Sequence, residues 1–355
     1  MSPSSRNPVR RLLVRAVNWI GDAVMTTPAI GLIREHFHDA EITLLANPLV
    51  AQLFSPHPGI DRVMTFDRTG AHRGFAGRLR LAAELRRQSF DAAIILPNSF
   101  DSALIPWLAG IPVRFGKSSD GRGLLLSKRY SPNERKWTGH EVDYYRELVR
   151  HFGITGSVRS PYLMVTPEEQ HEANLLLARH GIRPEEPVLG INPGATYGSA
   201  KRWYPERFAE VARQLATHWS ARVVIFGGPG ERDIANDIAA RLEGTGLNLA
   251  GQTNVRELMA LIKRCNFFVT NDSGPMHIAA AFGVPLVAIF GPTDHTGTAP
   301  FTDKAVVVRR DVPCAPCKLR ECPTDHRCMT AVTAGDVVQA ALRLMNEAPG
   351  KEMLK

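Results

Sequence analysis

Small polar and charged residues cluster where apolar runs of the sequence end. In the stretch NDSGPMHIAAAFGVPLVAIFGPTD, residues 271–294, an Asp-Ser-Gly turn separates one apolar run from a second. Backbone N–H groups at the start of a helix, together with the helix dipole, attract a phosphate group. We therefore expect Asp272, Ser273 and Gly274 to bind an anion, with His277 adding a hydrogen bond. A histidine at such a position can also be an ordinary packed side chain.

A second stretch, NPGATYGSAKRWYPERF at 192–208, has the same design. Its small residues let backbone N–H groups approach an anion, the Thr196 hydroxyl can donate a hydrogen bond, and Lys201 supplies a positive charge. The pattern is neither a Walker A loop nor GxGxxG. It predicts a cradle for a diphosphate, and the alternative is a surface loop that carries a lysine.

Two acidic residues also follow predicted strands. In FGGPGERD, residues 226–233, Glu231 could accept hydrogen bonds from ribose hydroxyls or simply favour a helix N-terminus. In NWIGDAVMTTPAI, residues 18–30, Asp22 is expected at or beside a helix N-cap, after an apolar turn that would partly desolvate its carboxylate. Asp22 is therefore a candidate general base, with helix capping as the alternative role.

Four of the five cysteines lie close together near the C-terminus, with the spacing C-x2-C-x4-C-x5-C. They are Cys314, Cys317, Cys322 and Cys328. In a reducing compartment such a density favours Zn²⁺ over disulfides. The spacing nevertheless lacks the two separated knuckles of a zinc ribbon, so a metal-free loop and a structural zinc site both stay open.

The elements that must position these residues alternate between strand and helix in both halves of the chain. Strands are predicted at 11–18, 41–46, 62–66 and 91–98, then at 188–194, 221–228, 266–272 and 286–291, with helices that include 22–36 and 79–88. The basic, glycine-rich stretch 114–129 is expected to be an exposed loop. Strand–helix alternation indicates parallel sheets, whose carboxyl ends form the ligand-binding edge.

A chain of 355 residues is long enough for two domains with full cores. We expect two Rossmann-like, doubly wound α/β domains, residues 1–165 and 166–355, facing each other across a cleft. The polar, proline-containing stretch around 155–185 marks the boundary between them.

The net charge of +8 is concentrated in the first half of the chain. Residues 1–155 carry 21 of the 43 Lys and Arg but 14 of the 35 Asp and Glu, a formal charge of +7. This excess indicates either an acidic macromolecular or membrane-surface partner or a solvated basic face. We find no recognisable nucleic-acid-binding module and do not expect a nucleic-acid partner.

Hydropathy argues against a membrane span. The longest nearly apolar run, 278–290, is too short to cross a bilayer and contains Pro285. The basic N-terminal stretch is interrupted by Arg15 and Asn18 before it could form a signal-peptide core. We therefore expect a cytoplasmic protein without a transmembrane segment.

The three stretches at 18–30, 192–208 and 271–294, in this order and spacing, resemble the bacterial ADP-heptose:lipopolysaccharide heptosyltransferases of glycosyltransferase family nine. The stretch VPCAPCKLRECPTDHRCM at 312–329 resembles their heptosyltransferase II branch, and the similarity runs over residues 10–345. RAVNWIGD departs from the pattern, which has a Leu-Pro pair before the Asn; the difference concerns the end of the strand.

The resemblance implies a GT-B fold, with an N-terminal domain that binds the lipopolysaccharide acceptor and a C-terminal domain that binds ADP-heptose. The implied reaction is an inverting transfer of L-glycero-D-manno-heptose onto the first heptose of the inner core. Asp22 would be the general base. The implied donor-binding residues are Thr196, Lys201, Glu231, Asp272, Ser273, Gly274 and His277, with Glu231 at the ribose.

The implied acceptor also accounts for the charge distribution. Inner-core lipopolysaccharide is rich in carboxylates and phosphates and would meet the basic half, which places the protein in the cytoplasm or at the cytoplasmic face of the inner membrane. The sequence contains no Asp-x-Asp, so the metal clamp of many glycosyltransferases is missing. Lys201 and helix N–H groups would stabilise the departing ADP, and we expect no cofactor and no divalent ion in catalysis.

Three alternative functions are compatible with the same fold class. The acceptor could be that of heptosyltransferase I or III or of another family-nine enzyme. A Rossmann dehydrogenase should show the glycine fingerprint with an acidic residue about twenty positions on, which is absent. A non-catalytic sugar-nucleotide-binding module would keep Lys201 but could dispense with Asp22.

Overall fold

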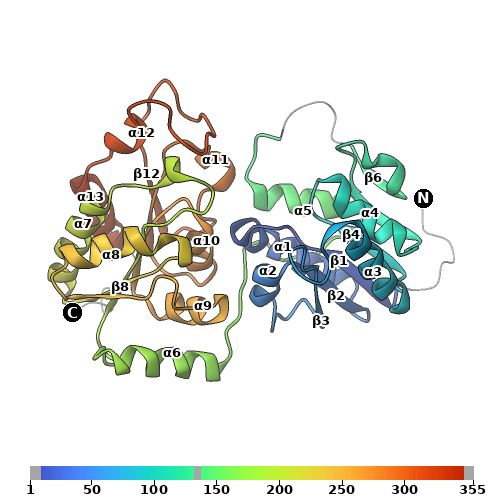
Figure 1. The fold of residues 1–355 in the computed structure, drawn as a ribbon, viewed down its shortest axis with the longest axis horizontal. Helices are drawn as coiled ribbons and strands as arrows, with labels where there is room; N and C mark the ends of the chain where they lie inside the picture. Colours follow the sequence, from blue (N-terminus) through green and yellow to red (C-terminus); the bar gives the residue numbers. More distant parts are fainter. Residues whose placement is uncertain (1–8, 132–136, 348–355) are drawn as a thin grey trace. The chain divides into compact units, whose positions relative to one another are not determined.

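The computed structural model describes residues 9–131 and 137–347 and divides the chain into two compact units, Met1–Met164 and Val165–Lys355 (Figure 1). Each unit contains one sheet with helices packed around it. None of the described helices has both the length and the apolar character needed to cross a membrane.

The described part of unit 1 contains a six-stranded parallel sheet with the order β3-β2-β1-β4-β5-β6. Its strands are β1 (Arg11–Arg15), β2 (Glu41–Ala46), β3 (Arg62–Thr65), β4 (Ala92–Ile95), β5 (Val113–Lys117) and β6 (Lys128–Tyr130). Its helices are α1 (Ile20–His36), α2 (Pro48–Leu53), α3 (Gly74–Arg87), α4 (Phe100–Leu108), the 3-10 turn η1 (Arg122–Leu125) and α5 (Glu141–His151). The order reverses between β1 and β4, as in dinucleotide-binding folds.

Unit 2 repeats this arrangement with the order β12-β11-β10-β7-β8-β9. Its strands are β7 (Val188–Asn192), β8 (Arg222–Ile225), β9 (Gly246–Asn248), β10 (Phe267–Asn271), β11 (Leu286–Ile289) and β12 (Ala305–Val308). Its helices are α6 (Pro167–Arg179), η2 (Ser199–Lys201), α7 (Pro205–Trp219), η3 (Pro229–Glu231), α8 (Arg232–Arg241), α9 (Val255–Arg264), α10 (Gly274–Ala281), α11 (His295–Thr298), α12 (Arg327–Thr330) and α13 (Ala334–Glu347). The predicted α/β class with two doubly wound sheets is confirmed.

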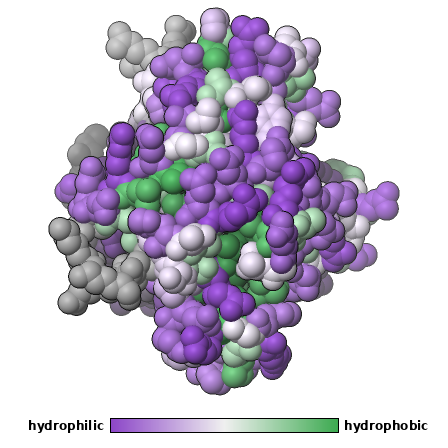
Figure 2. Space-filling model, turned by 90° about the vertical axis from the view of Figure 1, so that its left-hand side faces the viewer, coloured by the Kyte–Doolittle hydropathy of each residue, from purple (hydrophilic) through white to green (hydrophobic). Residues whose placement is uncertain are grey.

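The strands that position the ligand-binding edge of unit 2 are fully enclosed. Every residue of β7 and β10 is buried. This agrees with their apolar sequences, because a parallel sheet is covered by helices on both faces. Phe208, Leu215 and Trp219 of α7 share a core cluster with Val223 and Phe267 of the sheet. The face of unit 2 that Figure 2 shows is mainly hydrophilic, with smaller hydrophobic patches among the polar residues.

The prediction of an exposed loop at 114–129 is wrong. This stretch contains β5, η1 and β6, and the side chain of Arg122 is fully buried. Its guanidinium donates hydrogen bonds to the carbonyls of Lys117 at 2.8 Å and Pro97 at 2.5 Å. Burial lowers the pKa of Arg122. Basic residues and glycines indicate exposure on average, but an arginine whose N–H groups meet backbone carbonyls can be part of a core.

A buried histidine holds the end of unit 1 against its sheet. His57 is 5% exposed and packs between the rings of Phe54 and Tyr162. Its Nδ1 accepts a hydrogen bond from the N–H of Gly59 at 3.1 Å, so the proton is on Nε2, which lies 3.2 Å from the carbonyl of Tyr162. Burial disfavours the charged imidazolium and lowers the pKa of His57 from 6.5 to about 4, and the hydrogen bond to the carbonyl of Tyr162 opposes this shift only in part.

This histidine predicts a pH dependence of stability. The contribution of neutral His57 to the free energy of unfolding is complete above pH 6.5 and is lost as the pH falls from 6.5 to about 4. Between these pH values the unfolded chain takes up a proton that the folded chain does not. The loss should reach about 3 kcal/mol in the free energy of unfolding. In denaturant titrations, the advantage of the wild type over His57→Gln should narrow as the pH falls. The exposed control His171→Gln should follow the wild type at every pH, and an advantage independent of pH would contradict the assignment.

Candidate functional site

The structure brings together the predicted polar segments at the carboxyl edge of the unit 2 sheet. β7 ends at Asn192 and β10 ends at Asn271, and the two strands are neighbours. The amide of Asn192 donates to the hydroxyl of Ser273 at 3.1 Å, and the amide of Asn271 donates to the carbonyl of Pro193 at 2.6 Å. These two buried asparagines cross-link the loop after β7 to the turn after β10. Neither asparagine was predicted as a site residue, although a polar residue at the end of a strongly apolar strand was a usable signal.

Lys201 and Asp272 form a buried ion pair. The ammonium lies 2.6 Å from the Asp272 carboxylate, and the side chains are 13% and 5% exposed. The same carboxylate oxygen accepts a hydrogen bond from the hydroxyl of Thr293 at 2.6 Å. The backbone N–H of Asp272 is bonded to the carbonyl of Ile289. Asp272 is thus placed to hold Lys201 rather than to present a hydrogen-bond donor to an anion.

The N-terminus of α10 has no side-chain cap. Its N-cap residue is Ser273, whose hydroxyl makes no capping bond and instead contacts Asn192 and Thr270. Pro275 occupies the first turn, as the sequence indicated. His277 lies in the second turn and is 5% exposed, so it is largely a packed residue with a partner in the structure. The positive end of this helix dipole is directed at the same edge as Lys201.

The remaining predicted residues of unit 2 lie on the same edge. Thr196 is exposed in the loop between β7 and η2. Glu231 ends η3, where its carboxylate accepts the N–H of Gly228 at 2.7 Å. A side chain at Gly194 would collide with that carboxylate, since a Cβ there would lie 2.0–2.2 Å from its atoms. Glu231 is therefore fixed under the loop after β7, and its capping role is present in the structure.

Asp22 belongs to unit 1 and lies inside the first turn of α1, whose N-cap is Trp19. The predicted helix start at Asp22 was therefore two residues late. Asp22 is partly buried and close enough to Tyr145 of α5 to raise the pKa of that phenol, although burial of Tyr145 is the larger cause. Trp19 is 49% exposed, so it shields the carboxylate less than the sequence suggested.

A pocket of about 360 Å³ lies beside this turn, at the carboxyl ends of the first three strands of unit 1. Its lining residues are Asn18, Trp19, Asn47, Pro48, Phe66, Asp67, Arg68 and Thr69. Arg15, at the end of β1, is 3% exposed and donates to Asn18 Oδ1 at 3.3 Å. Its Nε has no partner among the described residues, and burial lowers its pKa to about 10. Burial of Arg15 beside this pocket was not predicted, although an arginine within an apolar strand was a signal for it.

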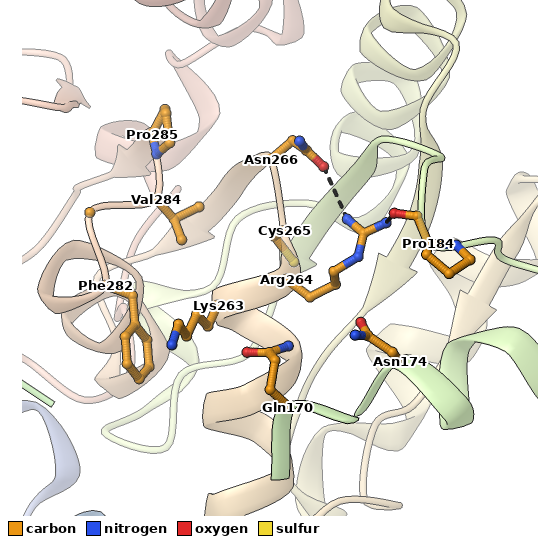
Figure 3. A pocket seen from close by; sticks show the side chains of 11 residues that line it. Gln170, Asn174, Pro184, Lys263, Arg264, Cys265, Asn266, Phe282, Val284 and Pro285 are labelled. Carbon is orange, nitrogen blue, oxygen red and sulfur yellow. Dashed lines mark hydrogen bonds between the residues drawn. The ribbon is translucent and has the colours of Figure 1, made fainter. Parts of the chain in front are cut away.

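A second pocket, of about 460 Å³, lies at the opposite edge of the unit 2 sheet (Figure 3). Gln170 and Lys263 lie around it, and Arg264 bonds to the side chain of Asn266 and the carbonyl of Pro184. None of the residues predicted for function lines it. This pocket lies at the amino ends of β10 and β11, away from the carboxyl edge that holds the predicted residues.

For the four clustered cysteines, the sequence leaves a structural zinc site and a metal-free loop as alternatives. Among the residues that the structure describes, no group of three or more His, Cys, Asp and Glu side chains is arranged to hold a metal ion. All five cysteines are free thiols.

The ion pair of unit 2 predicts a large energetic coupling. Lys201→Met leaves a buried carboxylate without its counter-ion and should lower the free energy of unfolding by about 3 kcal/mol. Asp272→Asn should also be costly, and the double variant should recover at least half of the summed loss. A double-mutant cycle from urea titrations measures the coupling. The exposed pair Arg241 and Asp237 of α8, changed in the same way, should couple by less than about 1 kcal/mol, and equal couplings would contradict the assignment.

Comparison with known proteins extends over both units. The sequence model of glycosyltransferase family 9 (heptosyltransferase) matches residues 78–327. Lipopolysaccharide heptosyltransferase 2 of Salmonella typhimurium is 33% identical over 307 residues, which cover 84% of this chain and 88% of that protein.

Two solved structures have the same fold over nearly their whole length. A glycosyl transferase family 9 protein from Veillonella parvula has a TM-score of 0.88 at 25% identity and covers 97% of this chain and 99% of its own. ADP-heptose lps heptosyltransferase II of E. coli has a TM-score of 0.80 at 30% identity, with coverages of 95% and 100%. The resemblance seen in the sequence motifs is confirmed, and the chain belongs to glycosyltransferase family 9, the heptosyltransferases.

Proposed function

We propose that this protein transfers L-glycero-D-manno-heptose from ADP-heptose to the first heptose of the lipopolysaccharide inner core, with inversion at the anomeric carbon. The observation that carries the proposal is similarity to heptosyltransferase 2 of Salmonella typhimurium over most of both chains. The E. coli heptosyltransferase II structure supports it, because the same two-sheet architecture spans that whole chain.

Unit 2 is the donor-binding unit in this proposal. The support is the carboxyl edge of its sheet, where a lysine, exposed hydroxyls and the uncapped start of α10 lie together. The diphosphate would be bound by Thr196, Lys201, Ser273, Gly274 and, through Lys201, Asp272. Glu231 would reach the ribose from η3, and His277 would support α10 from inside.

The ion pair determines how Lys201 can meet a diphosphate. An ammonium has three N–H donors, and Asp272 engages one of them. The carboxylate repels an anion on its own side of the ammonium. A diphosphate is thereby directed to the side of Lys201 away from Asp272. There the other N–H donors, which lie over the ring of Tyr197, would neutralise the charge that develops on departing ADP.

Unit 1 is the acceptor-binding unit in this proposal. Residues 1–155 carry a formal charge of +7, which suits an acceptor rich in carboxylates and phosphates. The pocket that Asn18 and Trp19 line offers two side-chain amides, a hydroxyl and Arg68, together with the carboxylate of Asp67, to the polar groups of a sugar chain. Such an acceptor is carried by a lipid, so we place the enzyme at the cytoplasmic face of the inner membrane, held by electrostatic contact.

The transfer needs a base and a stabilised leaving group. Asp22 would accept the proton of the acceptor hydroxyl. At the same time the oxygen of that hydroxyl would bond to the anomeric carbon of the heptose, and the bond between this carbon and ADP would break. The proton passes to the carboxylate, and ADP leaves with the bonding electron pair. Lys201 and the α10 N-terminus would stabilise the diphosphate charge, so we infer that the transfer step needs no divalent ion.

The base assignment predicts a specific loss of turnover. Asp22→Asn keeps the size of the side chain but cannot take the proton, so kcat should fall about 10²–10⁴-fold with ADP affinity unchanged. Asp233→Asn is the matched control, because Asp233 is also a first-turn aspartate, in α8. Steady-state kinetics, ADP titration and thermal melting compare the two. If Asp22 only stabilises the helix, the variant will melt earlier and turn over almost normally.

The acceptor is tested with defined inner-core substrates. With ADP-heptose as donor, we expect transfer to a core that ends in the first heptose, and no transfer to a core that ends in Kdo. Activity should persist in EDTA, since cationic groups of the chain replace a metal. Transfer to the Kdo-terminated core would identify a heptosyltransferase I activity, and a requirement for a longer core would identify a type III activity. ADP binding without turnover on any core would favour a non-catalytic binding module.

A further inference from the structure

Helix α4 of unit 1 is apolar on the side that faces away from its sheet. Its inner side is packed, since Ile105 is fully buried and belongs to a core cluster of unit 1. Phe100, Leu104 and Trp107 follow one another at spacings of four and three residues and therefore form one line along the helix. Phe100 is 45% and Trp107 is 46% exposed, and Leu104 is partly exposed. A surface helix usually presents charged or polar residues on this side.

The polar residues of α4 do not interrupt this line. Asp101 forms an ion pair with Arg78 of α3, and the hydroxyl of the buried Ser102 donates to the carbonyl of Ser99 at 2.6 Å. Both polar side chains are thus bonded within unit 1. The outer line of α4 consequently offers water no hydrogen-bonding side chain, and contiguous apolar surface of this kind is typical of a contact with a protein or a membrane.

Helix α3 lies beside α4 and runs in the same direction (Figure 1). The ion pair between Arg78 and Asp101 joins the two helices near their starts. Arg86, in the last turn of α3, donates to the carbonyl of Leu108, the last residue of α4, at 2.5 Å. The two helices are therefore held together at both ends.

The exposed side of α3 continues the apolar surface. Phe75 is 65% and Leu79 is 44% exposed, and a spacing of four residues places them on one side of the helix. Arg78 lies between them in sequence and reaches α4, so the apolar lines of the two helices adjoin. We call their five members the apolar face: Phe75, Leu79, Phe100, Leu104 and Trp107.

Most of the net charge of the protein lies on the same part of the chain. Residues 73–129, which contain α3, α4 and η1, carry 10 Lys and Arg against 4 Asp and Glu, a formal charge of +6 out of the total of +8. On α3 itself, Arg80, Arg86 and Arg87 are exposed. The apolar face is thus bordered by positive charge.

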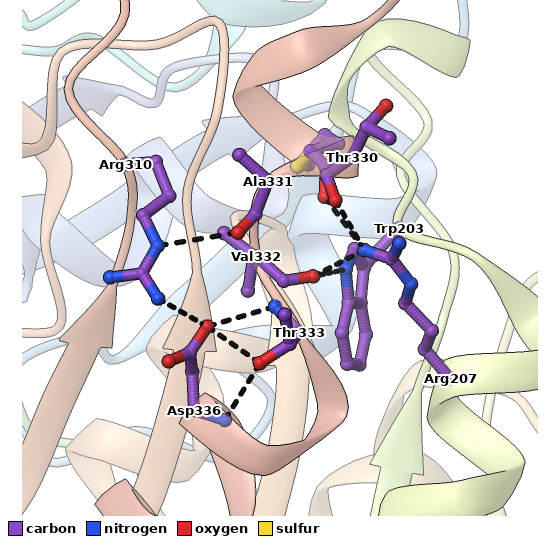
Figure 4. A network of polar contacts seen from close by, with 9 residues as sticks. Trp203, Arg207, Arg310, Thr330, Ala331, Val332, Thr333 and Asp336 are labelled. Carbon is purple, nitrogen blue, oxygen red and sulfur yellow. Dashed lines mark hydrogen bonds and ion pairs between the residues drawn. The ribbon is translucent and has the colours of Figure 1, made fainter.

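Trp107 differs from a tryptophan that the core encloses. Trp203 is 1% exposed, and its indole N–H donates to the carbonyl of Val332 at 3.1 Å (Figure 4). Trp107 is half-exposed, and its indole N–H makes no hydrogen bond within residues 9–131 and 137–347. A ring that packs on apolar side chains and leaves its N–H to water is the arrangement that tryptophan adopts at the boundary between a bilayer and water.

We propose that the apolar face and the arginines beside it bind the surface of a bilayer that contains anionic lipids. The aromatic and leucine side chains enter the boundary between head groups and acyl chains, and Arg80, Arg86 and Arg87 contact the lipid phosphates. Burial of apolar area and attraction between opposite charges act on the same surface, so both strengthen the contact.

The charge of the face favours a lipid surface over a second copy of this chain. A symmetric dimer would bring the same patch of two chains together and place two regions of charge +6 opposite each other, where they repel. An anionic bilayer supplies the opposite charge and an apolar interior in one partner. The inference rests on the proposed function in one respect, because the acceptor in that proposal is carried by a lipid of the same bilayer.

Vesicle binding by the full chain tests the proposal. The protein should co-sediment with vesicles of phosphatidylethanolamine and phosphatidylglycerol, should be released by high salt, and should not bind vesicles of phosphatidylcholine. Phe100→Ser with Trp107→Ser should weaken binding at least about tenfold, and Arg80→Gln with Arg87→Gln about thirtyfold. Leu175→Ser on α6 of unit 2 is the matched control, because it removes an exposed leucine outside the face, and it should bind like the wild type.

A fluorescence measurement keeps the test decisive if the serine variant does not fold. Acyl chains that carry bromine quench a tryptophan that lies at the bilayer boundary. The wild type should be quenched on vesicles of such lipids. Trp107→Phe, which keeps an aromatic ring, should bind almost as well but lose most of the quenching. Quenching that persists in Trp107→Phe would place the contact at another tryptophan and overturn the proposal.

Equal binding by the wild type and the serine variant would also overturn it. So would a wild-type dimer that fails to bind vesicles and dissociates in the serine variant, since the apolar face would then hold a second copy of the chain. The outcomes for the proposed function are separate. Vesicle binding by a protein that is inactive on every core would refute the transferase proposal alone. Transfer to a detergent-solubilised core by a protein that never binds vesicles would refute the membrane surface alone.

Discussion

The ion pair between the ammonium of Lys201 and the carboxylate of Asp272 is the contact on which the carboxyl edge of unit 2 depends. It joins two segments about seventy residues apart in the chain and lies where water is largely excluded. In such a place neither charge is tolerable without the other, because an uncompensated buried charge costs several kcal/mol. The pair therefore requires the loop after β7 and the turn after β10 to hold a fixed mutual position.

The surrounding structure is organised to meet that requirement. The side-chain amide N–H of Asn271 donates to the carbonyl of Pro193, and the side-chain oxygen of Asn271 accepts the backbone N–H of Trp203. The loop that contains Lys201 is therefore bonded to β10 on both sides of the lysine. Trp203 is buried and edge-packed on Phe208, which connects the loop to the core under α7. The hydrogen bonds at the strand ends thus fix the path of the loop that contains Lys201, and the apolar packing of Trp203 below it keeps the loop rigid. A charged group held in this way is preorganised for a ligand and needs little rearrangement on binding.

Much of this arrangement was predictable from the sequence, and the reasons are local. EITLLA at 41–46 and the apolar runs before Asn192 and Asn271 are short, β-rich and bounded by turn residues, so β2, β7 and β10 were expected. Parallel pairing then placed the polar turns on one edge. The Lys201–Asp272 contact was not predictable, because which side chains meet across a sheet edge depends on loop paths. Arg122 and Arg15 were missed for a related reason: whether a charge is buried depends on carbonyls supplied by distant segments.

Both sheets have the same strand order, with the first strand of each unit next to the fourth. Each unit therefore has its own crevice at the point where the order reverses. In unit 1 the turn after β1 carries a carboxylate and lies above a buried arginine, whereas in unit 2 the turn after β7 carries a lysine bonded to its neighbour. The same strand order thus presents an acidic side chain in unit 1 and a basic side chain in unit 2. Because each crevice has its own loops, the loops at one crevice can change in sequence without disturbing the packing or the charges at the other.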